Sequence, residues 1–140
     1  MPGYSLVELL ITIAIIGILA AMVMAVAVPA RNKAQDARIR NDIAQLRWEA
    51  EIVFDSQGAS FENWTSHPTV TENVDIILAD IDEALGANDA ATVKDSDAAT
   101  YCVSAPLVSV PERHYCIDAQ GVFEEVSSPC PSSPPFECQI

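Results

Sequence analysis

Residues 3–13 of this 140-residue chain read GYSLVELLITI, in which a glycine and an aromatic residue are followed by a single acid, Glu8. Directly behind the acid, residues 9–28 form a run of twenty residues without a charge. A helix rises about 1.5 Å per residue, so this run would span about 30 Å, the thickness of the hydrocarbon core of a bilayer. The chain is therefore predicted to begin with a membrane-spanning helix that carries one carboxylate at its head.

Three kinds of segment could explain this start. A cleavable secretory signal would use Ala25-Val26-Ala27 as its cleavage site, but such signals have shorter apolar cores and a basic start, and the first eight residues contain no Lys or Arg. A plain single-pass anchor explains the length but not Glu8, because an ionised carboxylate within a membrane usually has a partner. The third kind of segment supplies that partner.

The segment from Gly3 to Ala21 closely resembles the class III signal of the type IV pilin and pseudopilin family. In this family a prepilin peptidase cuts after the glycine and methylates the new N-terminus. The resemblance implies cleavage between Gly3 and Tyr4 and methylation of Tyr4. Glu8 matches the family's glutamate, and Gly17 matches its glycine within the apolar run.

Two features of this region depart from the family pattern. The family's leader is longer and basic, so we expect residues 1–3 to be the remnant of a longer leader that the peptidase removes. By the positive-inside rule, Arg31 and Lys33 would place the residues after the apolar run in the cytoplasm, whereas the motif implies the opposite orientation, which we adopt. The family's helix-bending proline would fall at Ala25, but the chain has its proline at Pro29.

The helical pattern continues beyond the proline. Apolar residues recur at intervals of three or four, at Ile39, Ile43, Leu46, Ala50 and Val53. Gly58 is a typical helix stop. The sequence therefore predicts one helix over residues 4–57, of which residues 4–30 lie in the membrane and later in a filament core. A globular head is predicted over residues 58–140.

The head is predicted to combine a second helix with a small antiparallel sheet. Residues 69–72 fit a capping box, and Gly86 would end the helix that follows it. Residues 88–99 are predicted to form a loop, and the proline-rich tail from residue 127 an irregular segment. Three segments have strand-like patterns: Tyr101–Ala105, Tyr115–Ala119 and Val122–Val126. A long helix packed against a small antiparallel sheet is an α+β fold, which the family resemblance also implies.

The charge of the chain is acidic and uneven. The net charge is −13, and residues 59–140 hold fourteen acidic residues but only Lys94 and Arg113 as basic ones. Binding to nucleic acid requires clustered Lys and Arg, so no general nucleic-acid binding is expected. We attribute the acidity to solubility.

The four cysteines are predicted to form two disulfides. Cys102 and Cys116 lie in matching Tyr-Cys contexts, and a hairpin centred near Ser109 would place them opposite each other. Cys130 and Cys138 bracket a proline-rich loop that resembles the disulfide-closed region of many type IV pilins. We favour the pairs Cys102–Cys116 and Cys130–Cys138, although the sequence alone allows three pairings. A zinc site is the alternative, but the chain has no CxxC pair.

Other polar clusters give weaker predictions. Asp95 and Asp97 alternate in a loop and are a weak calcium candidate, without the spacing of an EF-hand. His67 and His114 have no evident nucleophile and orienting acid, so we expect no catalytic triad, no enzyme and no cofactor. Residues 63–65 read Asn-Trp-Thr, the triplet that accepts N-linked glycans in secreted proteins.

Taken as a set, these features predict a structural filament subunit, a pilin. The expected partners are identical subunits in a helical homopolymer, with Glu8 paired to the N-terminal amine of a neighbour and Gly17 permitting close helix packing. Prepilin peptidase, the inner-membrane pilus assembly machinery and membrane lipid before assembly are the other expected partners. The subunit would start as a single-pass precursor in the inner membrane and end in an extracellular pilus filament. The alternatives are a type II secretion pseudopilin and a single-pass membrane-anchored binding module.

Overall fold

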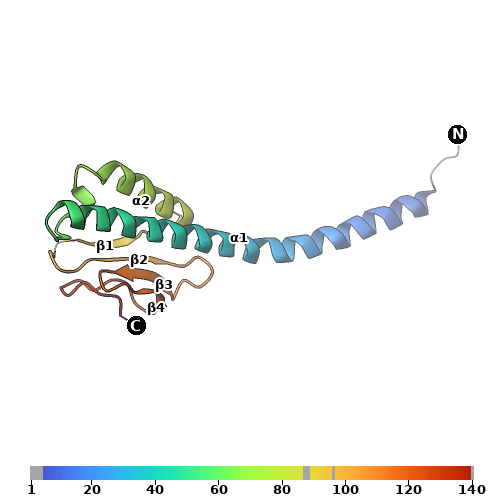
Figure 1. Ribbon diagram of the computed structural model, residues 1–140. Coiled ribbons are helices and arrows are strands. Elements are labelled where there is room, and N and C mark those ends of the chain that lie inside the picture. The colour runs from blue at the N-terminus through green and yellow to red at the C-terminus, as the bar shows by residue number, and fades with distance from the viewer. Residues whose placement is uncertain (1–4, 87–88, 96, 140) are drawn as a thin grey trace. The chain divides into compact units, whose positions relative to one another are not determined.

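One long helix, α1, runs from Leu6 to Ser56 (Figure 1). The computed structural model describes residues 5–86, 89–95 and 97–139, and contacts between residues divide the chain into two compact units, residues 1–32 and 33–140. The single long helix that the sequence predicts is confirmed, although Tyr4, its predicted first residue, lies outside the described residues. After α1 the chain turns at Gly58, whose φ of 72° is a left-handed conformation that favours glycine.

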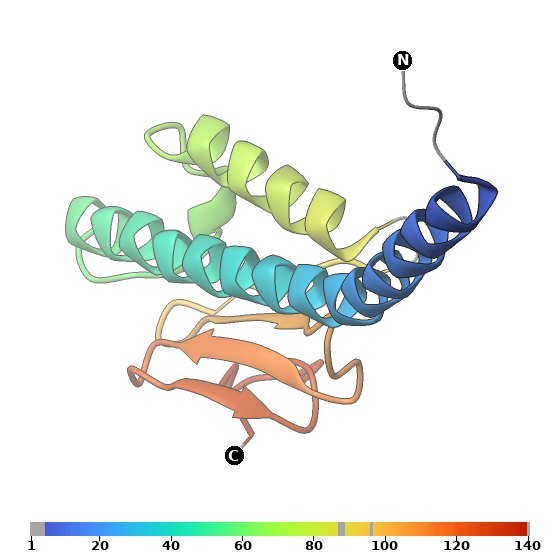
Figure 2. The ribbon, with the colours of Figure 1, turned by 90° about the vertical axis from the view of Figure 1, so that its right-hand side faces the viewer.

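The second unit contains a helix on one side of α1 and a sheet on the other (Figures 1 and 2). A 3₁₀ turn, η1, covers Trp64–Ser66 and leads into the helix α2, Thr71–Leu85. The antiparallel sheet has the order β1-β2-β3-β4. Its strands are β1, Thr92–Lys94; β2, Cys102–Pro106; β3, His114–Asp118; and β4, Phe123–Val126. This is the α+β arrangement of the type IV pilin fold, as predicted.

Two details of the predicted head are wrong. The segment 88–99 was expected to be a loop, but it contains β1, which pairs with β2 over only three residues and is too short to show a periodic pattern. The predicted capping box at residues 69–72 is absent, because α2 begins at Thr71 and its N-cap residue, Val70, has no capping side chain. Instead, the Thr71 hydroxyl donates a 2.8 Å hydrogen bond to the carbonyl of His67. The predicted end of this helix is confirmed, with Gly86 at φ 88°.

The core forms on the apolar stripe of α1. All five predicted stripe residues, Ile39, Ile43, Leu46, Ala50 and Val53, are fully buried. They pack in one cluster with apolar residues of α2 and with one face of the sheet, which includes Val103, Ala105 and Ile117. At about 1.5–3 kcal/mol for each fully buried large aliphatic side chain, this stripe is the main attachment of the helix to the head.

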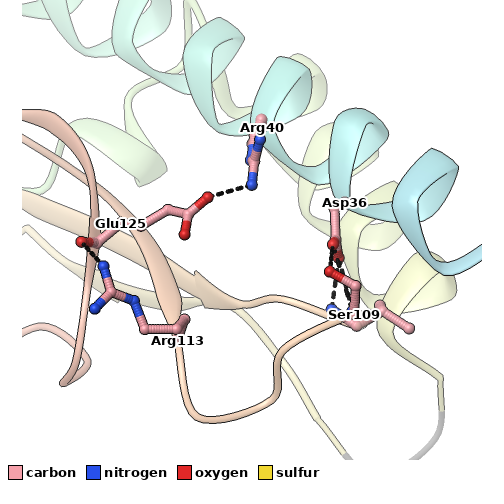
Figure 3. Close-up of polar contacts among 6 residues, drawn as sticks. Asp36, Arg40, Ser109, Arg113 and Glu125 are labelled. Atoms are coloured by element: carbon pink, nitrogen blue, oxygen red, sulfur yellow. Dashed lines mark hydrogen bonds and ion pairs between the residues drawn. The ribbon is translucent and has the colours of Figure 1, made fainter. Parts of the chain in front are cut away.

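Polar contacts fix the register of α1 against the sheet (Figure 3). The carboxylate of Asp36 is buried and accepts hydrogen bonds from the amide of Val108 at 2.6 Å and from the amide and hydroxyl of Ser109. One turn further along α1, Arg40 pairs with the carboxylate of Glu125. Arg113 donates a 2.7 Å hydrogen bond to the carbonyl oxygen of Glu125. The loop between β2 and β3 and the end of β4 are therefore both held to the same helix.

The second face of the sheet is covered by the C-terminal tail, and this arrangement corrects the predicted disulfides. The bonds are Cys102–Cys130 and Cys116–Cys138, not Cys102–Cys116 and Cys130–Cys138. The hairpin is centred one residue later than predicted, so Cys102 lies opposite Asp118 and Cys116 lies opposite Ser104. Diagonal positions in a sheet are too far apart for a direct bond at ordinary disulfide geometry. Each strand cysteine therefore bonds to one cysteine of the tail.

Three buried side chains of the sheet region also hold the tail through its backbone amides. Ser104 accepts a 3.0 Å hydrogen bond from the amide of Cys130, and Thr100 accepts one of 3.0 Å from Phe136. Asp118 accepts a 2.8 Å hydrogen bond from Cys138 with one carboxylate oxygen. With its other oxygen Asp118 binds the amides of residues 120 and 122, which form the turn into β4. The tail has no regular secondary structure, so its backbone amides donate hydrogen bonds to side chains instead of to other strands.

The contact between α1 and α2 contains a buried acid. Arg38 of α1 forms a two-point ion pair with Asp80 of α2, and Gln35 donates a 3.1 Å hydrogen bond to the carbonyl of Ala84. Asp42 is 6% exposed. The pKa of Asp42 is raised to about 6, mainly by burial and also by the nearby Asp80 carboxylate, while Arg38 acts in the opposite direction. The folded head therefore holds a proton on Asp42 more tightly than the unfolded chain does.

We predict that Asp118→Ala destabilises the head strongly even with both disulfides intact. The substitution leaves three backbone amides without their acceptor, and each buried unsatisfied group costs about 1–3 kcal/mol. The expected loss is about 3 kcal/mol in the free energy of unfolding, measured by urea denaturation of the full chain in mild detergent. Glu124→Ala, which removes an exposed acid of β4, is the matched control. Equal midpoints for the two variants would contradict the role given to Asp118.

We also predict that Asp42→Asn stabilises the head at pH 8 and not at pH 4. Because the folded pKa of Asp42 lies near 6 and its unfolded value near 4, its contribution to stability is complete below pH ~4 and is lost as the pH rises through 6. Asparagine has no proton to lose, so the variant should gain about 1–2 kcal/mol over the natural chain at pH 8. Asp75→Asn, at an exposed position of α2, makes the same charge change and should have little effect. A gain that is independent of pH would rule out the proposed titration.

Candidate functional site in the N-terminal segment

The start of α1 is closed by its own Ser5 and Glu8. The amide of Ser5 donates a 3.0 Å hydrogen bond to the Glu8 carboxylate, and the Ser5 hydroxyl accepts a 3.4 Å hydrogen bond from the amide of Val7. This is a capping box in which the serine hydroxyl accepts from the second helical amide, Val7, rather than from the third, Glu8. Sequence reasoning missed it here, although Ser-Leu-Val-Glu has the spacing that identifies one.

The capping box gives Glu8 a partner inside its own subunit. A carboxylate in the first helical turn is also stabilised by the helix dipole, by about 0.3–1 kcal/mol at an exposed position. Glu8 is exposed, and the hydrogen bond from Ser5 uses only its Oε2 atom. The other oxygen, Oε1, can therefore accept a hydrogen bond from a donor outside the subunit while the cap remains intact.

The apolar surface behind Glu8 is bare. α1 is the one helix among the described residues that is long and apolar enough to cross a membrane. Its large side chains between Leu6 and Val28 are 52–74% exposed, for example Ile15 at 52% and Met24 at 74%. Exposed apolar area costs roughly 25 cal/mol per Å² in water, so this part of the helix requires lipid or other apolar helices around it.

Gly17 lies in the middle of this bare surface. Apart from its chain neighbours and the local helix backbone, no atom of the described residues lies within 4 Å of the place where its side chain would begin. Ala14, Ala20 and Ala21 are three or four positions away, so they share a face of α1 with Gly17. Nothing in the described part of the subunit itself requires a small residue here. The helix continues on both sides of Pro29.

The predicted cleavage site cannot be placed. Gly3 and Tyr4 lie outside the described residues. The first described residue, Ser5, is exposed and precedes the helix. The site of processing therefore remains a prediction from the motif.

The calcium candidates, Asp95 and Asp97, are both engaged in hydrogen bonds, Asp95 with residues 63–65 and Asp97 within its own loop. Asp95 accepts one from the Thr65 hydroxyl, and its carbonyl accepts one of 2.7 Å from the amide of Asn63. Asp97 accepts a 2.6 Å hydrogen bond from the Thr100 hydroxyl, which lowers the pKa of its carboxyl. A cation would have to compete with these donors for the same oxygens.

The cysteines do not form a metal site. The sulfurs of Cys102, Cys116 and Cys138 lie within 4.8 Å of one another, but all four cysteines are in disulfides. A sulfur in a disulfide is not the thiolate that zinc requires. His114 is half-buried on β3, and burial lowers the pKa of its imidazole.

Comparison with known proteins identifies the N-terminal segment. The family model of the prokaryotic N-terminal methylation motif matches residues 2–24, which include Glu8 and the apolar run behind it. No curated protein and no solved structure is detectably similar to the chain. The motif implies processing by prepilin peptidase, and the family consists of structural subunits rather than enzymes. Residues 2–24 thus carry the prokaryotic N-terminal methylation motif, the class III signal peptide of type IV pilins, and this motif supports a type IV pilin-like or pseudopilin-like protein.

Proposed function

We propose that this chain is the structural subunit of a type IV pilus filament. The precursor spans the inner membrane once, and prepilin peptidase cuts after Gly3 and methylates Tyr4. The pilus assembly machinery then moves the subunit from lipid into a helical homopolymer outside the cell. The observation that carries this proposal is the methylation motif continued by an apolar surface that the subunit leaves exposed from Leu6 to Val28.

In the filament, Glu8 pairs with the N-terminal amine of a neighbouring subunit. Charges attract more strongly away from water, and this attraction offsets part of the cost of removing both charges from water. The capping box supports this role, because it holds the Glu8 carboxylate at the helix start through Oε2, so that Oε1 can accept a hydrogen bond from a neighbouring subunit. A subunit with the wrong axial stagger would bury Glu8 without a partner and would be disfavoured.

Gly17 permits close approach of neighbouring helices in the filament core. Small residues allow helix backbones to approach each other in the absence of water, where packing replaces the hydrophobic effect. The empty space around Gly17 in the subunit supports a role between subunits.

A type II secretion pseudopilin is the nearest alternative, since it shares the methylation motif. Two disulfides tie the C-terminal tail to the sheet, which favours a subunit built for an exposed extracellular filament. A calcium ion bound near Asp95 and Asp97, with no fibre on the cell surface, would favour the pseudopilin. A monomeric membrane-anchored binding module would retain Gly3 and would leave Glu8 without an external partner.

Mass spectrometry of the purified protein tests the processing step. We expect the mature chain to lack Met1-Pro2-Gly3 and to carry one methyl group on the amine of Tyr4. The anchor alternative instead predicts an intact N-terminus. Electron microscopy of the same cells separates a pilin from a pseudopilin, because only the pilin forms surface fibres.

Substitution of Glu8 tests the charge pairing. Glutamine can still accept the hydrogen bond from the amide of Ser5, so Glu8→Gln keeps the capping box and removes only the charge. We expect this variant to be processed normally but to give at least about tenfold fewer filaments, since loss of a buried charge pair costs more than 1.4 kcal/mol. Immunoblots of membrane and sheared surface fractions measure both steps.

Ser5→Ala is the matched control for Glu8→Gln. It removes the hydroxyl that accepts from Val7 but keeps the Glu8 charge, so it should retain most of the filaments. A normal filament yield for Glu8→Gln would exclude charge pairing, and a loss confined to Ser5→Ala would assign the role of this segment to the helix cap.

A further inference from the structure

The two disulfides lie against each other between the sheet and the tail. The Sγ atom of Cys102 is 3.5 Å from the Sγ atom of Cys116, although these two cysteines are not bonded to each other. The sulfur of Cys138 is also close, so that three sulfurs lie within 4.8 Å of one another. Cys130 brings the fourth sulfur through its bond to Cys102. The fold therefore gathers four sulfurs at one place in a chain that has no CxxC pair.

The spacing across the sheet suits a metal ion better than a disulfide. Zinc holds four thiolates in a tetrahedron at about 2.3 Å, which places neighbouring sulfurs about 3.8 Å apart. The 3.5 Å between the sulfurs of Cys102 and Cys116 is close to this value. Within each bonded pair the α-carbons are 5.9 or 6.0 Å apart, so rotation about the Cα–Cβ bonds can separate the sulfurs once the disulfides are reduced. The reduced cysteines can thus surround one zinc ion with little movement of the backbone.

The surroundings of the four sulfurs are dry. Cys102 and Cys116 are fully buried, and Cys130 and Cys138 are only 7% and 9% exposed. Apolar side chains of β4 and of the tail pack in the same cluster. Structural zinc sites are closed in this way by four protein ligands, and the attraction between thiolates and a divalent cation is stronger away from water.

The tail cysteines are also positioned by contacts that do not involve their sulfurs. The amide of Cys130 donates a 3.0 Å hydrogen bond to the Ser104 hydroxyl, and the amide of Cys138 donates one of 2.8 Å to the Asp118 carboxylate. These hydrogen bonds can persist when the disulfides are reduced. They therefore hold the tail thiols beside the strand thiols, as outer-shell contacts orient the ligands of a metal ion.

We propose that the reduced chain binds one Zn²⁺ through Cys102, Cys116, Cys130 and Cys138, and that disulfide formation releases it. Thiolates select zinc over calcium and magnesium, and the four thiols lose their protons as the Zn–S bonds form. On oxidation each new disulfide passes two electrons to an external disulfide, which is reduced to two thiols. Zn²⁺ then leaves, because a sulfur in a disulfide is not a thiolate ligand. The inference concerns the chain before oxidation and does not depend on the filament function.

Metal titration of the full chain in mild detergent tests this inference. The disulfides are reduced with a phosphine under nitrogen, and the chain is titrated with Co²⁺ and then with Zn²⁺. Cobalt in a tetrahedral thiolate site absorbs visible light strongly, and the intensity of its sulfur-to-cobalt band counts the thiolates. We expect one metal ion per chain with four thiolate ligands. The same reduced chain in guanidinium chloride should bind Zn²⁺ at least about tenfold more weakly, because unfolding removes the outer-shell contacts.

Cys116→Ser provides the variant, and Glu124→Gln its control. Loss of a ligand costs more than loss of an outer-shell contact, so Cys116→Ser should lower the Zn²⁺ affinity of the reduced chain at least about 100-fold. Glu124 is an exposed acid that lies opposite Cys116 on β4, and Glu124→Gln should leave the affinity unchanged. Circular dichroism of both reduced variants separates loss of a ligand from loss of the fold. If Cys116→Ser does not fold, the thiolate count of the natural chain decides.

The oxidised chain is the control for binding by acids, since it has the same carboxylates and no thiols. Equal Zn²⁺ binding by the oxidised and reduced chains would overturn the inference. A reduced chain that binds no Zn²⁺, that offers fewer than three thiolates, or that binds equally well when unfolded would also overturn it. Oxidised glutathione added to the zinc-loaded chain should restore both disulfides and release one Zn²⁺ to a chromophoric chelator. Zinc that stays bound after both disulfides have formed would contradict the release.

Discussion

The exclusion of water from one stripe of α1 is the constraint on which the rest of the head depends. The stripe from Ile39 to Val53 is fully buried, and α2 and the sheet are the two elements that cover it. Hydrophobic burial is not directional, so polar contacts are required to set the register. The Asp36 carboxylate supplies such a contact by binding the two successive amides of the loop after β2. Arg38 and Arg40 do the same toward α2 and β4.

α1 covers one face of the sheet, and the opposite face requires a separate cover. Side chains alternate along a strand, so the residues next to Val103 and Ile117 point away from α1. These residues include Cys102, Cys116 and Asp118, and the tail closes over them. A tail rich in proline is poorly suited to form a strand, because each proline lacks an amide donor for the ladder. Its amides are instead satisfied by Thr100, Ser104 and Asp118, and two disulfides fix it in place.

Both halves of α1 carry apolar side chains that must be kept from water, and they differ in what covers those side chains. Within the head, the apolar stripe of the helix is covered by the chain itself, as for Leu46. From Leu6 to Val28 they are left bare, and the capping box at Ser5 and Glu8 closes the helix before this surface begins. The filament function proposed above would require both arrangements, since the subunit would first lie in lipid and then pack against copies of itself. Charge is also unevenly distributed, since most of the basic residues lie on α1 and most of the acidic residues lie in the rest of the head.

The sequence by itself determined the features that depend on neighbours along the chain. A run of twenty uncharged residues, a stripe at intervals of three or four, and Glu8 at its fixed distance from Gly3 are local patterns, and they predicted the long helix, its buried face and the N-terminal methylation motif. Only the tertiary structure decided the disulfides, β1 and the roles of Asp36 and Asp118. These depend on which residues meet across the sheet, and a shift of one residue in the centre of the hairpin moved Cys116 from opposite Cys102 to opposite Ser104. Register is set by long-range packing, which no local pattern in this chain records.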